Sequence, residues 1–250
     1  MIDAKSLALT GVCKRFGELR AVQDVSLEVR TGERRALIGP NGAGKTTLFH
    51  VISGVERPTS GRIEMLGQDV TGLPMHRRTC LGMARTFQLT NLFSRLSVEQ
   101  NILLALQGLK GMKLSMLRPL GSYRELTATA RDLLEDWGFL EKREVPVHEL
   151  SYGEQRSLEI ILAVSQRPRL LLLDEPTAGL SPAETRAASD LIRALPRDMS
   201  IVLIEHDLDV VFGLCDSMTV LHLGEVLATG DPASVRANSE VQEIYFGETL

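Results

Sequence analysis

The residues best suited to chemistry lie in a glycine-rich segment, GPNGAGKTT, at residues 39–47. Its glycines let consecutive backbone N–H groups converge on phosphate oxygens, and a helix that begins near Lys45 would point the positive end of its dipole at them. The Lys45 ammonium adds a charge, Thr46 offers a hydroxyl to Mg²⁺, and Thr47 offers one more donor. We therefore predict a site for the β- and γ-phosphates of a nucleotide rather than a chance glycine-rich turn. Its members are Gly39, Pro40, Asn41, Gly42, Ala43, Gly44, Lys45, Thr46 and Thr47.

Two adjacent carboxylates, Asp174 and Glu175, follow an apolar run of four leucines. Open α/β sheets bind ligands at the carboxyl ends of their strands, and neighbouring carboxylates repel each other unless a cation is near. We expect Asp174 to hold Mg²⁺, directly or through water, and Glu175 to polarise a water that attacks the γ-phosphate. A helix-capping Asp-Glu pair is the plainer interpretation, which the phosphate loop upstream makes the weaker one.

Three isolated side chains are further candidates for contact with a nucleotide. His206 follows the apolar run IVLIE and can hydrogen-bond the γ-phosphate, or it is an ordinary loop histidine. Gln88 follows MARTF and can ligate Mg²⁺ through its amide oxygen or cap a loop. Phe16 can stack on a base such as adenine or pack in the core. Each side chain keeps both interpretations when it is taken alone.

A second anion site is suggested by the segment LSYGEQR at residues 150–156. Ser151 and Gly153 stand at the start of a helix that continues through Leu158 and Ile161, so backbone N–H groups are free to meet an anion. The phosphate loop already has its own helix N-terminus. The second site would therefore meet the nucleotide held by another copy or a paralogue, unless it is an ordinary capped helix.

The predicted strands and helices lie where they would position these segments, with a strand before the phosphate loop and a helix after it. VSLEV at residues 25–29 predicts a half-buried strand, and ERRALIG at residues 33–39 predicts a more buried strand directly before the phosphate loop. KTTLFHVIS at residues 45–53 predicts a helix that ends at Gly54. RLLLLDEP and SIVLIEHD predict two further buried strands, and TVLHLGEVLATG predicts a terminal hairpin.

The strand signal disappears between about residues 97 and 166, which predicts a helical insertion. Ser97 with Gln100 makes a capping box at its start. The stretch LKGMKLSMLRPLGS, rich in Lys, Met and Gly, predicts an irregular surface excursion. One later helical face is formed by Leu126, Ala130, Leu133, Leu134 and Trp137.

The start of a helix after the insertion is well marked. Ser181 can cap it, Pro182 suits its first position and Glu184 completes a capping box. This helix follows the Asp174–Glu175 pair closely, so it belongs to the same part of the chain.

The composition bounds the class of protein. The chain has 250 residues, of which 44% are hydrophobic and 24% charged, which fits one large α/β domain with an insertion. A formal net charge of −4 gives no global basic field, so we expect no nucleic-acid partner. Three scattered cysteines suggest neither a zinc site nor disulfides. We find neither a secretory signal nor an apolar run of roughly 20 residues, so we expect a cytoplasmic chain that reaches a membrane only through partners.

Taken in order, GPNGAGKTT, Gln88, LSYGEQ, LLLLDEP, AGLSP at residues 178–182 and His206 resemble the motifs of ABC ATPases over nearly the full chain. The resemblance implies a single α/β domain at residues 1–250, with a P-loop NTPase core built on a mixed or parallel sheet, an antiparallel β subdomain and an inserted helical subdomain. The implied division is a catalytic core at residues 1–87 and 167–230, a helical insertion with the signature segment at residues 88–166, and a C-terminal helical tail at residues 231–250.

The same resemblance implies a head-to-tail dimer that holds two ATP molecules, each with Mg²⁺. Ser151 and Gly153 would contact the ATP of the partner, and Ser181 would lie in the loop called the D-loop. Gln88 would begin the loop that contacts a membrane subunit. The chain departs from the common signature because Tyr152 stands where glycine is usual and glutamate stands at residue 154 where glutamine is frequent.

A narrower resemblance is carried by ARTFQLTNLF, EHDLDVVFGLCD and GDPASVRANSEVQEIYFGE, which look like the ATPases of branched-chain amino-acid uptake systems. It implies an ATP-hydrolysing importer subunit on the inner face of the plasma membrane. Its partners would be a second ATPase subunit, whether a paralogue or the same chain, integral permease subunits and, through them, an extracytoplasmic solute-binding protein. Uptake of urea or short-chain amides, a soluble mechanical ABC ATPase and a non-hydrolysing nucleotide switch are the alternatives.

Overall fold

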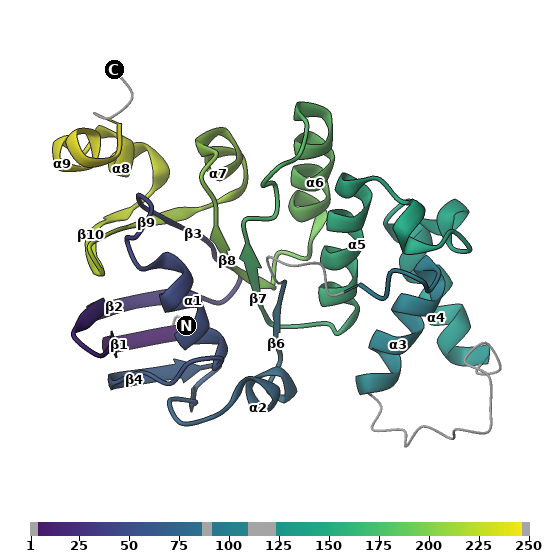
Figure 1. Ribbon diagram of the computed structural model, residues 1–250, viewed down its shortest axis with the longest axis horizontal. Coiled ribbons are helices and arrows are strands. Elements are labelled where there is room, and N and C mark those ends of the chain that lie inside the picture. The colour runs from purple at the N-terminus through teal and green to yellow at the C-terminus, as the bar shows by residue number, and fades with distance from the viewer. Residues whose placement is uncertain (1–4, 87–91, 110–123, 247–250) are drawn as a thin grey trace.

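The computed structural model describes residues 5–86, 92–109 and 124–246, and it contains two sheets with helices packed around them (Figure 1). The smaller sheet is antiparallel and has the order β2 (Leu19–Arg30), β1 (Lys5–Phe16), β4 (Ser60–Met65), β5 (Gln68–Asp69). In β2, buried Val25, Leu27 and Val29 alternate with exposed residues, as expected for a strand with one face on the core. This confirms the predicted strand at residues 25–29 and extends it in both directions.

The larger sheet is mixed. Its order is β10 (Glu225–Gly230), β9 (Ser217–His222), β3 (Arg34–Ile38), β8 (Ser200–Ile204), β7 (Leu170–Asp174), β6 (Met83–Arg85). The pairs from β9 to β6 are parallel, whereas β9 and β10 form the antiparallel hairpin predicted from TVLHLGEVLATG. Every residue of β3, β7 and β8 is buried, which explains their nearly continuous apolar runs.

Helices outside the insertion cover this sheet and begin at marked positions. They are α1 (Lys45–Ser53), α2 (Met75–Cys80), α6 (Pro182–Ala194), α7 (Leu208–Leu214), α8 (Pro232–Ala237), α9 (Ser239–Val241) and the π-helical turn η4 (Gln242–Phe246). The helix predicted at residues 45–53 is α1, with Gly54 as its left-handed C-cap. The capping box of Ser181 and Glu184 is formed at the start of α6, with Pro182 in its first turn.

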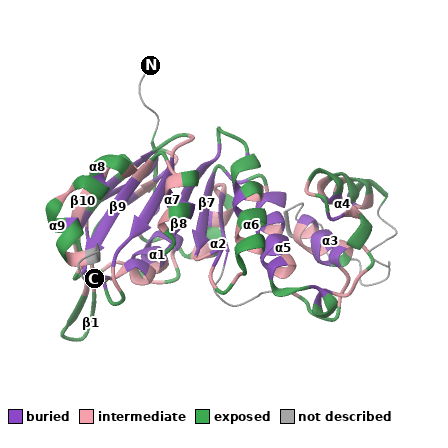
Figure 2. Ribbon diagram, turned by 90° about the horizontal axis from the view of Figure 1, so that it is seen from above, coloured by how far each residue is buried: buried purple, intermediate pink, exposed green. Residues whose placement is uncertain are grey.

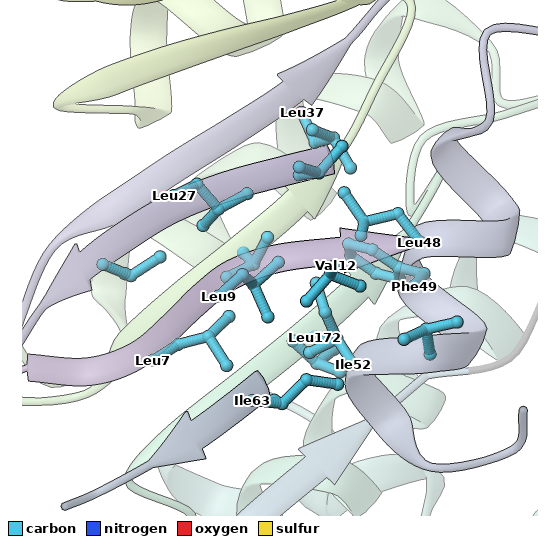
Figure 3. Packing of buried hydrophobic residues seen from close by; sticks show 14 of the residues in the cluster. Leu7, Leu9, Val12, Leu27, Leu37, Leu48, Phe49, Ile52, Ile63 and Leu172 are labelled. Carbon is cyan, nitrogen blue, oxygen red and sulfur yellow. The ribbon is translucent and has the colours of Figure 1, made fainter. Parts of the chain in front are cut away.

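Helix α1 packs in the hydrophobic core between the two sheets. Its Leu48, Phe49 and Ile52 lie beside Val12 of β1 and Leu172 of β7, and all five side chains are at most 1% exposed (Figure 3). Each such burial stabilises the fold by roughly 1.5–3 kcal/mol. The start of α1, where the phosphate loop ends, is therefore held by both sheets.

The helical insertion has an apolar cluster of its own. It consists of α3 (Val98–Leu109), α4 (Arg124–Asp136), the short helices η2 (Leu140–Lys142) and η3 (Val147–Glu149), and α5 (Tyr152–Ser165). The buried residues of α5 face two ways, since Leu158 and Ile161 join the insertion cluster and Ile160 and Val164 join the cluster beneath β7. Figure 2 shows α5 largely buried, whereas α6 keeps an exposed face. Helix α5 therefore links the insertion to the sheet that carries the candidate site.

The predictions for the insertion are met where the structure describes it. Ser97 and Gln100 form their reciprocal capping hydrogen bonds before α3. Leu126, Ala130 and Leu134 are buried on one face of α4, and Trp137 packs on the same cluster just beyond the end of the helix. The excursion predicted at LKGMKLSMLRPLGS falls largely outside the described residues, and the residue limits predicted for core, insertion and tail stay predictions. Among the described residues, no helix is long and apolar enough to cross a membrane.

Candidate functional site

The phosphate loop joins the end of β3 to the start of α1, and its glycines adopt conformations that other residues avoid. Gly42 and Gly44 have φ angles of 81° and 98°. A Cβ atom on Gly44 would lie 2.3 Å from the carbonyl oxygen of Ala21, so the neighbouring backbone demands a glycine there. A Cβ on Gly42 would meet no described atom within 4 Å. Gly42 therefore leaves open space beside the loop, which a phosphate can enter.

Lys45 is folded over its own loop. Its Nζ donates hydrogen bonds to the carbonyl oxygens of Gly39, at 2.6 Å, and Pro40, at 3.0 Å, and the residue is buried. Burial lowers the pKa of the Lys45 ammonium below its ordinary value, while the nearby Glu175 opposes that change. The first residue of α1 thus brings a cation to the helix N-terminus, where an anion is also favoured by the backbone N–H groups.

A cleft of about 390 Å³ brings the phosphate loop together with two side chains that are remote in sequence, Glu175 and His206. These follow β7 and β8, two neighbouring parallel strands, so their carboxyl ends meet at one edge of the sheet. The sequence indicated the loop, Glu175 and His206, but it gave no sign of four lining residues from outside those motifs. The full lining is Leu19, Arg20, Ala21, Asn41, Gly42, Ala43, Gly44, Lys45, Thr46, Thr47, Glu175, His206 and Leu223.

Glu175 and His206 are hydrogen-bonded to each other, with 2.8 Å between Glu175 Oε1 and His206 Nε2. Glu175 has a φ angle of 48°, in the left-handed region, and its backbone N–H donates to the carbonyl oxygen of Ile204. Backbone strain of this kind persists where surrounding contacts hold it, as is frequent at functional sites. The carboxylate and the imidazole face the same cleft and can act on one substrate.

Asp174, one residue earlier, is buried in an ion pair. Its Oδ2 accepts a hydrogen bond from Arg85 at 2.9 Å, while its Oδ1 is buried with no hydrogen-bond partner among the described residues. Burial raises the pKa of the Asp174 carboxyl, and Arg85 opposes the rise. Neither Asp174 nor Glu175 caps a helix, because α6 is capped by Ser181. The helix-capping interpretation is therefore wrong.

The donor set fits a magnesium ion that is shared with phosphate. Mg²⁺ takes oxygen ligands, and protein sites often supply only one or two of them beside substrate phosphates and water. The unpartnered carboxylate oxygen of Asp174 and the hydroxyl of Thr46, which lines the cleft, are oxygens of the kind that could hold such an ion. No cluster of three or more His, Cys, Asp or Glu side chains with metal-binding geometry occurs in the part of the chain that the structure describes.

The signature segment, LSYGEQR at residues 150–156, lies at the N-terminus of α5, and none of its residues lines the cleft. Ser151 and Glu154 form a capping box there, as the capped-helix interpretation requires, and the second anion site stays a prediction. The N–H of Gly153 donates to Oε1 of Glu184 at 3.3 Å, and Ser181 Oγ donates to the other carboxylate oxygen of Glu184 at 2.8 Å. The sequence indicated Glu184 as a cap of α6, but not that it joins α6 to the signature segment.

Two further side chains, Phe16 and Gln88, were predicted to contact the nucleotide. Phe16 does not line the cleft and is 47% exposed, with Lys14 Nζ 4.7 Å from the centroid of its ring. This excludes the core-packing interpretation of Phe16 and leaves its stacking on adenine a prediction. Gln88 lies outside the described residues. Just before it, Thr86 accepts a hydrogen bond from the backbone N–H of Asp174 at 3.3 Å through its Oγ1.

Comparisons with known proteins agree with this arrangement. The family model described as ABC transporter matches residues 22–178, and the model described as branched-chain amino acid ATP-binding cassette transporter matches residues 225–249. The chain is 41% identical over 249 residues to the high-affinity branched-chain amino acid transport ATP-binding protein LivG of Escherichia coli (strain K12), covering 97% of this chain and 98% of that one.

Two further similarities span nearly the whole chain. The chain is 39% identical over 253 residues to the high-affinity branched-chain amino acid transport ATP-binding protein BraF of Pseudomonas aeruginosa, covering 97% of this chain and 98% of BraF. Its fold is similar to the crystal structure of the ADP conformation of MJ1267, an ATP-binding cassette of an ABC transporter, with a TM-score of 0.87 and 29% identity over 97% of this chain and 99% of that one.

Proposed function

The chain belongs to the ABC transporter family, and from this premise we propose that it is the ATP-binding and ATP-hydrolysing subunit of an importer for branched-chain amino acids. The observation that carries the proposal is the single cleft on which the Lys45 loop, Glu175 and His206 meet. The substrate class is supported by the names of relatives that match nearly full length and by the family match at residues 225–249. The reaction is hydrolysis of an acid anhydride, with ATP as substrate.

We assign the phosphates of ATP to the loop between β3 and α1. The N–H groups at the start of α1 and the Lys45 ammonium would balance the charge of the β- and γ-phosphates. Bound magnesium, held by Thr46, Asp174 and the predicted Gln88, would supply further positive charge to those oxygens. The base of the nucleotide would lie towards β1 and β2, where Phe16 is the predicted stacking partner.

Glu175 is assigned as the general base. A water oxygen forms the new bond to the γ-phosphorus, the bond from that phosphorus to the bridging oxygen of ADP breaks, and Glu175 takes the proton that the water loses. His206, 2.8 Å from Glu175, orients the carboxylate and can donate to the γ-phosphate from the same cleft. Phosphoryl transfer needs mainly positioning of the water and stabilisation of charge, and Glu175, His206 and Lys45 would supply both.

Hydrolysis would require a second cassette. Ser151 and Gly153 do not line the cleft of their own chain, although they stand at a helix N-terminus suited to an anion. We propose that they and Ser181 contact the ATP held by a partner cassette, either a paralogue or a second copy. Binding of ATP would then draw two cassettes together, and hydrolysis would release them.

A groove beside the insertion is the proposed contact with a permease subunit. It has a volume of about 430 Å³ and lies where β6 meets α3 and α5, and its lining includes residues that precede and follow Gln88 in the sequence. Phe93 is 60% exposed on this groove, and five of the ten other lining residues are apolar, which suits one helix of a membrane subunit. The lining residues are Arg85, Thr86, Leu92, Phe93, Asn101, Leu104, Ala105, Glu159, Leu162, Ala163 and Gln166. The chain would thus work on the cytoplasmic face of the plasma membrane, and an extracytoplasmic solute-binding protein would act through the permease.

Purification from membranes tests the assembly, and uptake tests the substrate. We expect a tagged chain to bring down integral permease subunits and a cassette partner. Cells that lack the chain should lose uptake of labelled leucine, which the wild-type chain restores and Lys45→Ala does not. Recovery of ribosomes or DNA without permeases would contradict a transport role, and restored uptake of urea rather than leucine would contradict the substrate class.

A further inference from the structure

Arg85 makes contacts that bear on the metal site, although the sequence marked it only as part of the segment ARTFQLTNLF and not as a residue of the nucleotide site. It is the last residue of β6, which pairs in parallel with β7, and its side chain is only 3% exposed. Its guanidinium donates to Asp174 Oδ2 and to Ser53 Oγ, each at 2.9 Å, and it lies 5.7 Å from the centroid of the Phe49 ring. Three elements, β6, β7 and α1, are joined through this one side chain.

The pair leaves the two oxygens of Asp174 in different situations. Oδ2 is occupied by Arg85, whereas Oδ1 is buried with no hydrogen-bond partner among the described residues. A buried acceptor without a partner is costly, and a bound ion is one arrangement that would offset this cost. Because the planar guanidinium fixes the direction of its hydrogen bonds, Arg85 also fixes which oxygen stays available.

The strand that carries Arg85 leads directly to Gln88. Thr86 makes two hydrogen bonds to β7, one on each side of Leu173. Its N–H donates to the carbonyl oxygen of Leu172 at 3.0 Å, and its Oγ1 accepts from the N–H of Asp174. Arg85 and Thr86 also line the groove proposed for a permease. Asp174 is therefore held by two residues that also line this groove and that shortly precede Gln88 in the sequence.

We propose that Arg85 is a positioning residue for the magnesium site, which holds Asp174 by Oδ2 so that Oδ1 is presented to the cation bound with ATP. This rests on the proposed function and adds a residue outside the nucleotide motifs. Arg85 touches neither the phosphates nor the metal and acts through Asp174. Its positive charge opposes the cation, but a buried carboxylate without its partner loses both orientation and hydrogen bonding, and we expect that loss to dominate. Residues that orient a metal ligand typically change metal affinity by about 10–100-fold when they are removed.

The test measures metal binding rather than turnover. Mn²⁺ takes oxygen ligands as Mg²⁺ does and is counted by paramagnetic resonance. Wild type, Arg85→Lys and Arg85→Met are compared with bound non-hydrolysable ATP analogue, with the protein in excess over nucleotide. Arg35→Lys is the matched control, because Arg35 is also a buried arginine, paired with Glu33 at 2.7 Å on β3 away from the cleft. Ser53→Ala removes only the second partner of Arg85.

We expect Arg85→Met to raise the Mn²⁺ concentration for half-saturation about tenfold and Arg85→Lys to give an intermediate value. Nucleotide binding in EDTA should be unchanged in both, and the two controls should match wild type. If Arg85→Met melts below the assay temperature, Arg85→Lys alone decides. Mn²⁺ affinity within twofold of wild type, or tighter, in folded Arg85 variants would overturn this inference while leaving the proposed function intact. A wild-type chain that binds no nucleotide would instead overturn both.

Discussion

Nε2 of His206 lies 2.8 Å from Oε1 of Glu175, across the carboxyl ends of two neighbouring parallel strands. The contact fixes a carboxylate whose backbone is already in an uncommon conformation, with a φ angle of 48°. A base that must align a water molecule with a phosphorus atom works best when its orientation is fixed. The pair therefore supplies an oriented base beside the phosphate loop.

Glu175→Gln should keep ATP binding and lose turnover. The amide is isosteric with the carboxylate but takes no proton from water, so we expect the ATPase rate to fall about 10²–10⁴-fold with the partner cassette present. ATP should then accumulate a closed dimer, visible by size-exclusion chromatography. Glu225→Gln, exposed on β10, is the control and should behave as wild type. Undiminished turnover in Glu175→Gln would remove this residue from the role of base.

Gly42→Ala should weaken ATP binding through sterics in the cleft. Gly42 and Gly67 both have positive φ angles, 81° and 79°, and a Cβ on either meets no described atom within 4 Å. Both alanine variants should therefore lose about 1 kcal/mol of stability to backbone strain, measured by urea unfolding. Only Gly42→Ala should lose ATP affinity, by about tenfold or more, since Gly67 lies in the turn between β4 and β5. Equal ATP affinity in the two variants would show that phosphate does not approach Gly42.

Ser151→Ala should separate the role of the α5 N-terminus in the dimer from its role as a cap. Ser151 and Ser97 each form a capping box, so replacing either with alanine should cost about 1 kcal/mol of stability. We expect only Ser151→Ala to raise the ATP concentration needed for dimerisation, measured by light scattering with the partner cassette. Similar dimerisation in both variants would reduce Ser151 to an ordinary cap.

Alkaline pH should destabilise the fold through Cys215. Burial between two apolar clusters raises the pKa of this thiol from 9.0 to about 12. Between these values the folded thiol keeps its proton while the unfolded thiol loses it, so stability falls as pH rises through the window. From pH 8 to pH 10 wild type should lose about 1.4 kcal/mol more than Cys215→Ala in urea unfolding. Cys80→Ala, at an exposed thiol, should keep the wild-type dependence, and parallel pH profiles for all three chains would refute the assignment.

The parts of the site that are contiguous in sequence could be predicted, because their signals are local. The phosphate loop carries its glycines, its lysine and both flanking elements within about 20 residues, and the capping boxes predicted for Ser97 and Ser181 are formed. Glu175 and His206 were predictable as strand-end residues. Their hydrogen bond was not, because it depends on β7 and β8 being neighbours, and no local pattern encodes that pairing.

The contacts that escaped prediction join segments far apart in the chain. Arg85 stands 89 positions before its partner Asp174 in the sequence. Their contact could not be predicted, because it depends on the pairing of β6 with β7. The family resemblance implied an antiparallel β subdomain, but nothing in the local sequence indicated that β1 pairs with β4 within it. Glu184 likewise reaches Gly153 only through the packing of α5 on α6. Such contacts are fixed by long-range packing rather than by spacing.

The proposed ATP site on the phosphate loop is best tested by measuring ATP affinity with and without magnesium, in wild type and in Lys45→Ala. Lys45 Nζ lies over the phosphate loop and donates hydrogen bonds to the carbonyl oxygens of Gly39 and Pro40. We propose that its ammonium balances the charge of the phosphates. Titration with a fluorescent ATP analogue should show magnesium-dependent binding in wild type and a loss of at least tenfold in Lys45→Ala. Wild-type binding that ignores magnesium, or an affinity unchanged by Lys45→Ala in a folded chain, would contradict a nucleotide-driven motor.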